Sequence, residues 1–179
     1  MRKTIRKWFW AWNFEKEEKW LNEMAAQGLA LVGVGFCKYE FEDALPGEYT
    51  VRMELLQNKK EHPESEKYIR FIEETGAEQV GNYLRWVYFR KKTADGPFDL
   101  FSDYASRIAH LKRIKTLLLP IGILNIWLGV QNVGLFFWQH FDGNLIGLVN
   151  LLLGILCCAG AIPLHRMIKT LKKEQQIFE

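Results

Sequence analysis

The sequence predicts an α+β protein. In it a ferredoxin-like βαββαβ domain, with a four-stranded antiparallel sheet and two helices on one face, precedes a two-helix transmembrane hairpin. Two apolar stretches, residues 116–138 and 145–165, contain no Asp, Glu, Lys or Arg. Each has the roughly 20 residues that a helix needs to cross the hydrocarbon core of a bilayer. The chain before them alternates between the two-residue period of strands and the helical period.

Charge is distributed unevenly over the 179 residues. The first 97 residues hold 16 basic and 16 acidic side chains, and because the totals are 24 and 21, the rest of the chain holds 8 and 5. A net charge of +3 is too small and too localised to predict a nucleic-acid partner. We expect a soluble domain (1–97), an amphipathic connector helix (98–115), the transmembrane hairpin (116–165) and a basic tail (166–179).

The soluble domain begins with a predicted strand over residues 3–12, in which Trp8 and Trp10 share one face. Asn13 is a favourable N-cap for the helix that follows, and Gly28 is typical of the residue just after a helix. The other predicted elements are a strand over 29–41, a strand over 49–55, a helix over 66–75 and a strand over 83–90.

A repeat in the sequence supports this order of elements. Residues 18–21 (EKWL) and Gly28 match residues 66–69 (EKYI) and Gly76, and the offset is 48 at every one of these positions. Each half is therefore expected to be one βαβ unit. Two such units interleave into the ferredoxin-like sheet.

The last predicted strand carries large apolar side chains on both faces, with Trp86 and Tyr88 on one and Val87 and Phe89 on the other. Either these side chains fill a small core and its rim, or the helix-free face of the sheet contacts a partner, a second copy or the lipid surface. The candidate interaction face consists of Trp8, Trp10, Trp86 and Tyr88.

Six segments distributed along residues 8–92 carry a family resemblance. They are FEKEEKWLNEMAAQGL (14–29), YEF (39–41), PGEY (46–49), YI (68–69), EETGAE (73–78) and WVYFRK (86–91). With these segments the chain resembles domain of unknown function 2812 (DUF2812), although Leu29 and Ala77 stand where the family usually has Trp. The resemblance implies a cytosolic domain followed by transmembrane helices in Gram-positive bacteria, often encoded beside PadR-like transcription regulators. It implies no catalytic residue.

Basic residues flank the predicted spans, whereas the short loop 139–144 between the spans has no Lys or Arg. The flanking residues are Arg107, Lys112, Arg113 and Lys115 before the first span and Arg166, Lys169, Lys172 and Lys173 after the second. By the positive-inside rule, both termini are expected in the cytosol, in a multi-pass protein of the cytoplasmic membrane. The connector either lies on the membrane surface or extends the first spanning helix.

Small and polar residues recur at helical spacing along each span. They are Gly122, Asn125, Gly129 and Asn132 in the first span and Gly147, Asn150, Gly154, Cys157 and Ala161 in the second. Such a stripe predicts a seam along which two helices approach closely. Equal depth on either side of the loop predicts the pairs Gly122–Ala161, Gly129–Gly154 and Asn132–Asn150, the last joined by a hydrogen bond. The alternative is that the asparagines line a polar path, but neither span holds an ionisable Asp, Glu, Lys or Arg.

No chemistry in the sequence identifies an enzyme. His62, His110, His140 and His165 stand at no metal-ligand spacing from another His or a Cys, and we predict no catalytic residue, metal or cofactor. We expect a regulatory or sensory module that contacts the lipid bilayer and either a protein partner or a second copy. The alternative is an accessory subunit of a transporter or an envelope-stress complex, whose hairpin packs on other spans.

Overall fold

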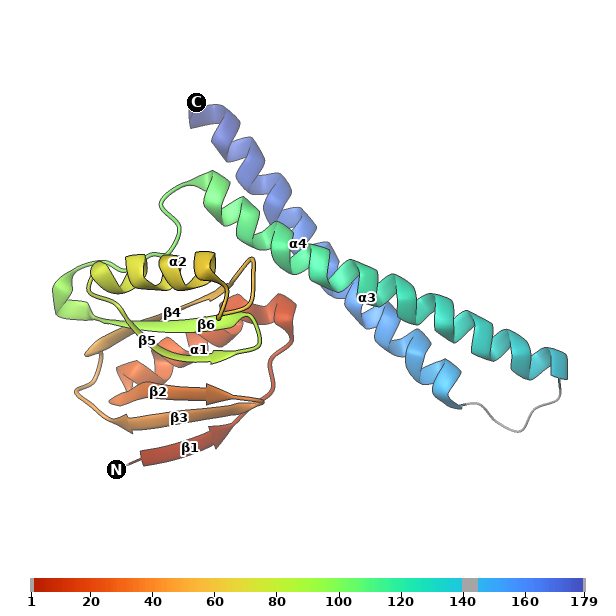
Figure 1. Ribbon diagram of the computed structural model, residues 1–179, viewed down its shortest axis with the longest axis horizontal. Coiled ribbons are helices and arrows are strands. Elements are labelled where there is room, and N and C mark those ends of the chain that lie inside the picture. Colours follow the sequence, from red (N-terminus) through yellow and green to blue (C-terminus); the bar gives the residue numbers. More distant parts are fainter. Residues whose placement is uncertain (1, 140–144, 179) are drawn as a thin grey trace. The chain divides into compact units, whose positions relative to one another are not determined.

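The computed structural model describes residues 2–139 and 145–178. The chain divides into two compact units, Met1–Ser102 and Asp103–Glu179 (Figure 1). The first unit is mixed α+β and the second is a pair of long helices. The first unit thus extends beyond residue 97, the predicted end of the soluble domain, because Phe98 is buried in its core.

The first unit consists of two β-α-β-β repeats. The first repeat contains β1 (Arg2–Arg6), α1 (Phe14–Ala26), β2 (Leu29–Gly35) and β3 (Lys38–Asp43). The second contains β4 (Tyr49–Leu55), α2 (Pro63–Glu74), β5 (Glu78–Tyr83) and β6 (Trp86–Lys92). Each repeat forms its own three-stranded antiparallel sheet, in the orders β1-β3-β2 and β4-β6-β5. Short 3-10 turns, η1 (Ala11–Asn13) and η2 (Thr93–Asp95), complete the unit.

The backbone repeats with the same 48-residue offset as the sequence. The register of β2 shifts between Leu31 and Gly33, and that of β5 shifts between Gln79 and Gly81. Both helices also end at a glycine with positive φ, Gly28 at 83° and Gly76 at 87°, as expected for a residue just after a helix. The repeated unit therefore includes one more strand than the predicted βαβ unit.

The structure does not contain the expected four-stranded ferredoxin-like sheet among its described residues. The single strand predicted over 29–41 is a hairpin, β2 and β3, that turns at Phe36 and Cys37. An equivalent turn at Leu84 joins β5 to β6. Cys37 and Leu84 have φ values of 51° and 54°. Gly and Asn are the residues that usually adopt this region. Because Cys37 and Leu84 are neither, the two turns cannot be recognised from these residue types.

The strand predicted over residues 3–12 is also shorter than expected. β1 ends at Arg6, which pairs with Lys38, the first residue of β3. Because β3 begins at Lys38, residues beyond Arg6 have no partner in this strand. One further backbone hydrogen bond follows, from the N–H of Lys7 to the carbonyl of Cys37 at 3.2 Å. Trp8 and Trp10 are therefore outside the sheet.

Helix α1 contacts both sheets through a buried carboxylate. Glu17 accepts hydrogen bonds from the hydroxyls of Tyr39 in β3 (2.7 Å) and Tyr88 in β6 (2.6 Å). The next residues of β6 on either side, Val87 and Phe89, instead pack in the core cluster formed with α2. Because neighbouring strand residues point to opposite faces, α1 and α2 cover opposite faces of the second sheet. The expected placement of both helices on one face is thus replaced by one helix on each face.

The second unit pairs α3 (Tyr104–Gln139) with α4 (Leu145–Phe178). Helix α3 is continuous, so residues 104–115 of the predicted connector extend the first apolar helix. The basic segment after residue 165 likewise continues α4 as far as Phe178. Each helix buries one stripe of side chains at spacings of three and four. The stripes are Ile108, Leu111, Ile114 and Leu118 in α3 and Ala161, Leu164, Ile168 and Leu171 in α4.

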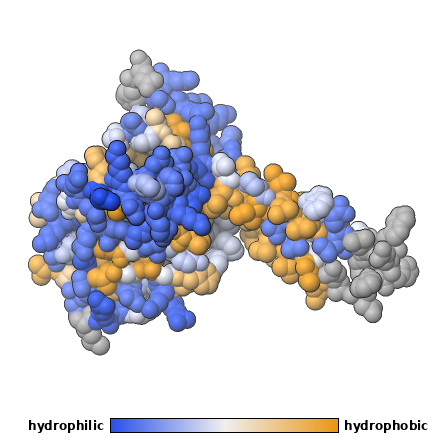
Figure 2. All heavy atoms as spheres, viewed as in Figure 1, coloured by the Kyte–Doolittle hydropathy of each residue, from blue (hydrophilic) through white to orange (hydrophobic). Residues whose placement is uncertain are grey.

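Both helices are long and apolar enough to cross a membrane, judged by length and composition. Large apolar side chains remain exposed along their outer surfaces (Figure 2). Examples are Ile123, Leu124, Trp127 and Val130 in α3 and Leu148, Leu152, Ile155 and Ile162 in α4. A core helix of a soluble protein would bury such side chains, because contact with water is unfavourable for them.

The buried Glu17 makes the stability of the first unit depend on pH. Burial raises the pKa of Glu17 above its ordinary value of 4.5, although the hydrogen bonds from Tyr88 and Tyr39 oppose the shift. The folded state therefore binds this proton more tightly than the unfolded state does. The resulting stabilisation is complete below pH 4.5 and is lost as the pH rises through the folded-state pKa.

We predict that Glu17→Gln flattens this pH dependence, because the amide oxygen still accepts both hydroxyl hydrogen bonds but carries no charge. Thermal unfolding of the full chain in detergent, measured between about pH 5 and pH 8, checks this. Glu17→Leu leaves both buried hydroxyls without their acceptor and is expected to cost about 1–3 kcal/mol for each. The control is Glu23→Gln, an exposed position on the same helix. An unchanged pH slope in Glu17→Gln would contradict the prediction.

Candidate functional site

An exposed apolar cluster lies where the two hairpin turns of the first unit meet. Trp8 is 53% exposed, Phe36 65% and Leu84 74%. The ring of Trp8 lies 5.2 Å from that of Trp10 and 5.8 Å from that of Phe36, measured between centroids, and both contacts are edge-to-face. We call Trp8, Trp10, Phe36 and Leu84 the aromatic tip.

Three segments that are distant in the sequence build the aromatic tip. The two tryptophans follow β1, Phe36 lies in the β2–β3 turn, and Leu84 lies in the β5–β6 turn. The rings of Phe36 and Tyr83 are 5.7 Å apart, so the two turns are adjacent. Gly81 permits this approach, because a Cβ atom there would lie 2.9 Å from the backbone nitrogen of Val34 in β2.

Basic side chains accompany the aromatic tip. Arg6 and Lys7 directly precede its tryptophans, and Arg85 follows Leu84, although its guanidinium donates to the carbonyl of Leu56 (2.8 Å from Nε). The Nζ atom of Lys60 lies 3.4 Å from Oδ1 of Asn82, near the end of β5. The surface therefore combines apolar rings, indole N–H donors and positive charge, which suits binding to an amphipathic or anionic surface. Within residues 2–139 and 145–178, no group of three or more His, Cys, Asp or Glu side chains is placed to hold a metal ion.

The structure separates the four residues of the predicted interaction face. Trp8 and Trp10 belong to the aromatic tip, whereas Trp86 is half-buried and stacks against Phe14, with ring centroids 6.1 Å apart. Tyr88 is only 4% exposed and points to Glu17, so it is a core residue. Phe36 and Leu84 are not among the predicted residues, because the sequence predicts neither hairpin turn.

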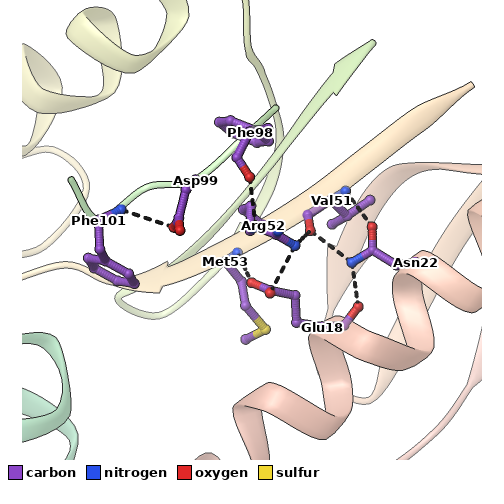
Figure 3. A network of polar contacts seen from close by, with 8 residues as sticks. All are labelled: Glu18, Asn22, Val51, Arg52, Met53, Phe98, Asp99 and Phe101. Carbon is purple, nitrogen blue, oxygen red and sulfur yellow. Dashed lines mark hydrogen bonds and ion pairs between the residues drawn. The ribbon is translucent and has the colours of Figure 1, made fainter. Parts of the chain in front are cut away.

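Polar side chains of α1 hold the free edge of β4 (Figure 3). The Asn22 amide donates to the carbonyl of Val51 at 3.0 Å, and its oxygen accepts from the N–H of the same residue at 2.9 Å. Because β4 is the edge strand of its sheet, these bonds satisfy backbone groups that no neighbouring strand pairs. The Asn22 side chain thus acts as a substitute for one residue of a further strand.

The same surface of α1 also fixes the point where the chain leaves the first unit (Figure 3). Glu18 accepts hydrogen bonds from the N–H of Met53 at 3.1 Å and from Nη1 of Arg52 at 3.2 Å. The Nε atom of Arg52 donates to the carbonyl of Phe98 at 3.0 Å. Burial raises the pKa of Glu18, and the positive charge of Arg52 opposes this. We call Glu18, Asn22 and Arg52 the exit network.

Glycines allow the backbones of α3 and α4 to approach closely. A Cβ atom on Gly122 would lie 3.3 Å from the carbonyl oxygen of Gly154, and one on Gly129 would lie 2.9 Å from that of Gly147. Both distances are shorter than ordinary van der Waals contact. Gly122, Gly129 and Gly154 thus lie in the contact between the helices, and Ala161 is buried.

The register of the two helices differs from the predicted one by about one helical turn. The Cβ position of Gly122 lies 2.8 Å from Sγ of Cys158 and 3.2 Å from Cβ of Cys157, so Gly122 faces these residues instead of Ala161. The Cβ position of Gly129 lies 2.6 Å from Cγ of Leu151, so Gly129 faces Leu151 instead of Gly154. Each glycine thus makes room for a larger residue of the facing helix and lets the two backbones approach.

The asparagines of the predicted seam have different surroundings. Asn132 lies beside Gly147 and donates its amide to the carbonyl of Leu128, one turn earlier, at 2.7 Å. Asn150 is half-buried in α4. The hydrogen bond between Asn132 and Asn150 stays a prediction.

The family model described as "Protein of unknown function (DUF2812)" matches residues 13–123. The chain belongs to this family. The DUF2812 match begins just before α1, includes the exit network and ends in α3, so it spans both units. Trp8 and Trp10 lie before the matched residues, whereas Phe36 and Leu84 lie within them. No curated protein and no solved structure matches the chain.

The close approach of the two helices at their glycines predicts different effects for two glycine substitutions in this DUF2812 protein. In Gly154→Ile the added Cβ would lie 2.6 Å from Cγ1 of Ile126 and 2.8 Å from the carbonyl oxygen of Gly122. We expect the helices to separate, at a cost of about 1–3 kcal/mol. Gly134→Ile is the control, because a Cβ there meets nothing within 4 Å.

The separation can be measured as the distance between spin labels on two exposed positions, Leu124 in α3 and Leu152 in α4. We expect a longer and broader distance distribution for Gly154→Ile and an unchanged one for Gly134→Ile. Equal distributions in the two variants would contradict the glycine contact.

Proposed function

We propose that this DUF2812 protein is an integral protein of the cytoplasmic membrane that holds a regulatory, non-enzymatic interaction domain at the cytosolic face. The aromatic tip is its binding surface. The observation that carries this proposal is an exposed aromatic cluster on a folded unit that is joined to two helices with apolar outer surfaces.

The membrane assignment rests on the outer surfaces of α3 and α4. Their exposed Leu, Ile and Val side chains are stable in hydrocarbon but not in water. The basic residues before the first apolar stretch and after the second favour a cytosolic position for both ends of the hairpin. The first unit, which precedes α3, then also lies in the cytosol.

The binding role rests on the residue types of the tip. Large exposed apolar patches on folded domains mark interaction surfaces, and Trp is among the residues that contribute most to binding energy. Trp8 and Trp10 are also held in place by ring contacts, since Trp10 stacks on Trp12 with centroids 4.9 Å apart. Little rotamer entropy is therefore lost on binding.

A regulatory role is supported by contacts that run from the tip region to the exit network. Phe9, between the two tip tryptophans, lies 5.6 Å from the ring of Trp20 in α1. Two residues before Trp20 on the same helix, Glu18 binds Arg52, which holds the carbonyl of Phe98. Binding at the tip that displaces α1 would thus alter the point where the chain leaves the domain. This is a contiguous physical route, and coupling along it is part of the proposal.

The proposal is tested in cells by placing a photo-reactive phenylalanine analogue at Phe36 in the full chain. We expect an adduct from this position that is lost when Trp8 and Trp10 are both replaced by Ser. Leu45 is the control, because it is 72% exposed but lies in the β3–β4 connection, at the other end of β3 from Phe36. Adducts of equal yield at both positions would contradict a binding role of the tip.

The same experiment addresses the alternative, an accessory subunit of a transporter or envelope-stress complex. In that case the outer surface of the hairpin is the binding surface. A photo-reactive residue at Val130 in α3 would then form adducts with other membrane proteins, while Phe36 would form none.

A further inference from the structure

We infer that the aromatic tip docks on the interfacial region of an anionic membrane surface, the cytosolic leaflet that the same chain spans. This inference rests on the proposed function, because it names the partner of the same surface. The tip thereby gives the domain a second, reversible attachment to the bilayer besides the hairpin.

The shape and residue types of the tip fit shallow insertion into a membrane. Phe36 and Leu84 lie at the ends of two adjacent hairpins and are among the most exposed large apolar side chains of the unit. Trp8 lies beside Phe36 and Trp10 lies beside Trp8, and Trp is enriched at the membrane–water interface because its ring is amphipathic. Two turns and a short irregular segment present few atoms, so they can enter the headgroup region without unfolding.

Charge complementarity favours an anionic leaflet. Arg6 and Lys7 directly precede Trp8 in the sequence, and the Nζ atom of Lys7 lies 5.1 Å from the ring centroid of Phe9, the residue between the two tip tryptophans. The carboxylate of Glu40 in β3 is paired with Lys38 at 2.5 Å, so it contributes little repulsion. Basic residues near an anionic membrane surface each strengthen binding, and the effect falls with added salt.

The small size of the tip favours a lipid surface over a protein or a second copy. A stable protein interface buries about 800 Å² on each partner and involves roughly 20–30 residues a side. The aromatic tip has four residues. A weak site is sufficient for a tethered domain, because the hairpin keeps it at a high effective concentration near the bilayer. Only residues 104–115, about 18 Å of helix at 1.5 Å per residue, separate the domain from the first predicted span.

The test uses the full chain in nanodiscs that hold one copy each. Leu84→Cys and Leu45→Cys are labelled with a fluorophore in a background carrying Cys37→Ser, Cys157→Ala and Cys158→Ala. The discs contain a lipid with a nitroxide quencher on its headgroup. We expect quenching at position 84 to exceed quenching at position 45 severalfold in discs with phosphatidylglycerol.

Two further variants and one condition make the outcome specific. The excess quenching at position 84 is expected to fall severalfold when Trp8 and Trp10 are both replaced by Ser, when Arg6 and Lys7 are both replaced by Glu, or when salt is raised. Equal quenching at the two labelled positions would overturn the inference, and so would quenching that is unchanged in discs of neutral lipid only.

The two proposals fail in different ways. A protein adduct from Phe36 in cells without excess quenching in nanodiscs would leave the proposed function standing and overturn lipid docking. If Phe36 gave neither an adduct nor excess quenching, both proposals would fall. Energy transfer between labelled copies in larger vesicles, without lipid quenching, would assign the tip to self-association and likewise overturn lipid docking.

Discussion

The first unit depends on one buried carboxylate that joins its two sheets. Glu17 accepts a hydrogen bond from Tyr39 in the first sheet and another from Tyr88 in the second. An acidic residue is rarely buried without partners, so this pair of hydroxyls is what allows α1 to lie against both sheets. With α1 held there, Asn22 reaches the edge of β4 and Glu18 reaches Arg52. The chain exit at Phe98 is thus positioned by the same helix that binds the two tyrosines.

The two repeats have the same backbone pattern but carry different residues at the positions through which α1 contacts the two sheets. At an offset of 48 residues, Ser65 and Arg70 in α2 stand where α1 has Glu17 and Asn22. Ser65 is buried, and Arg70 is exposed beside Glu66. Helix α2 therefore lacks the acceptor that bridges two sheets and instead packs an apolar side against β6. The two helices thus cover opposite faces of the second sheet with different chemistry, whereas the ferredoxin-like arrangement has both on one face.

Patterns with a long period could be predicted from the sequence, and local turns could not. The two apolar helices, the helix ends at Gly28 and Gly76 and the 48-residue repeat all follow from residue spacing and composition. The hairpin turns were missed because Cys37 and Leu84 adopt positive φ without a glycine signal. That omission also hid Phe36 and Leu84 as members of the tip. Tyr88 was assigned to a surface because its face of the sheet was expected to be free of helices, whereas α1 covers it. The predicted helix register was wrong by about one turn because equal depth was assumed, whereas Gly122 packs against Cys158 and Gly129 against Leu151.

The central claim is that the hairpin crosses the membrane and leaves the first unit in the cytosol. Labelling with a membrane-impermeant maleimide tests it most directly, in cysteine-free full-length protein with one cysteine placed either in the loop 139–144 or at Leu45. The account predicts that the loop cysteine is labelled on intact cells, whereas the cysteine at position 45 is labelled only after permeabilisation. Labelling of both cysteines on intact cells, or of neither before permeabilisation, would contradict it.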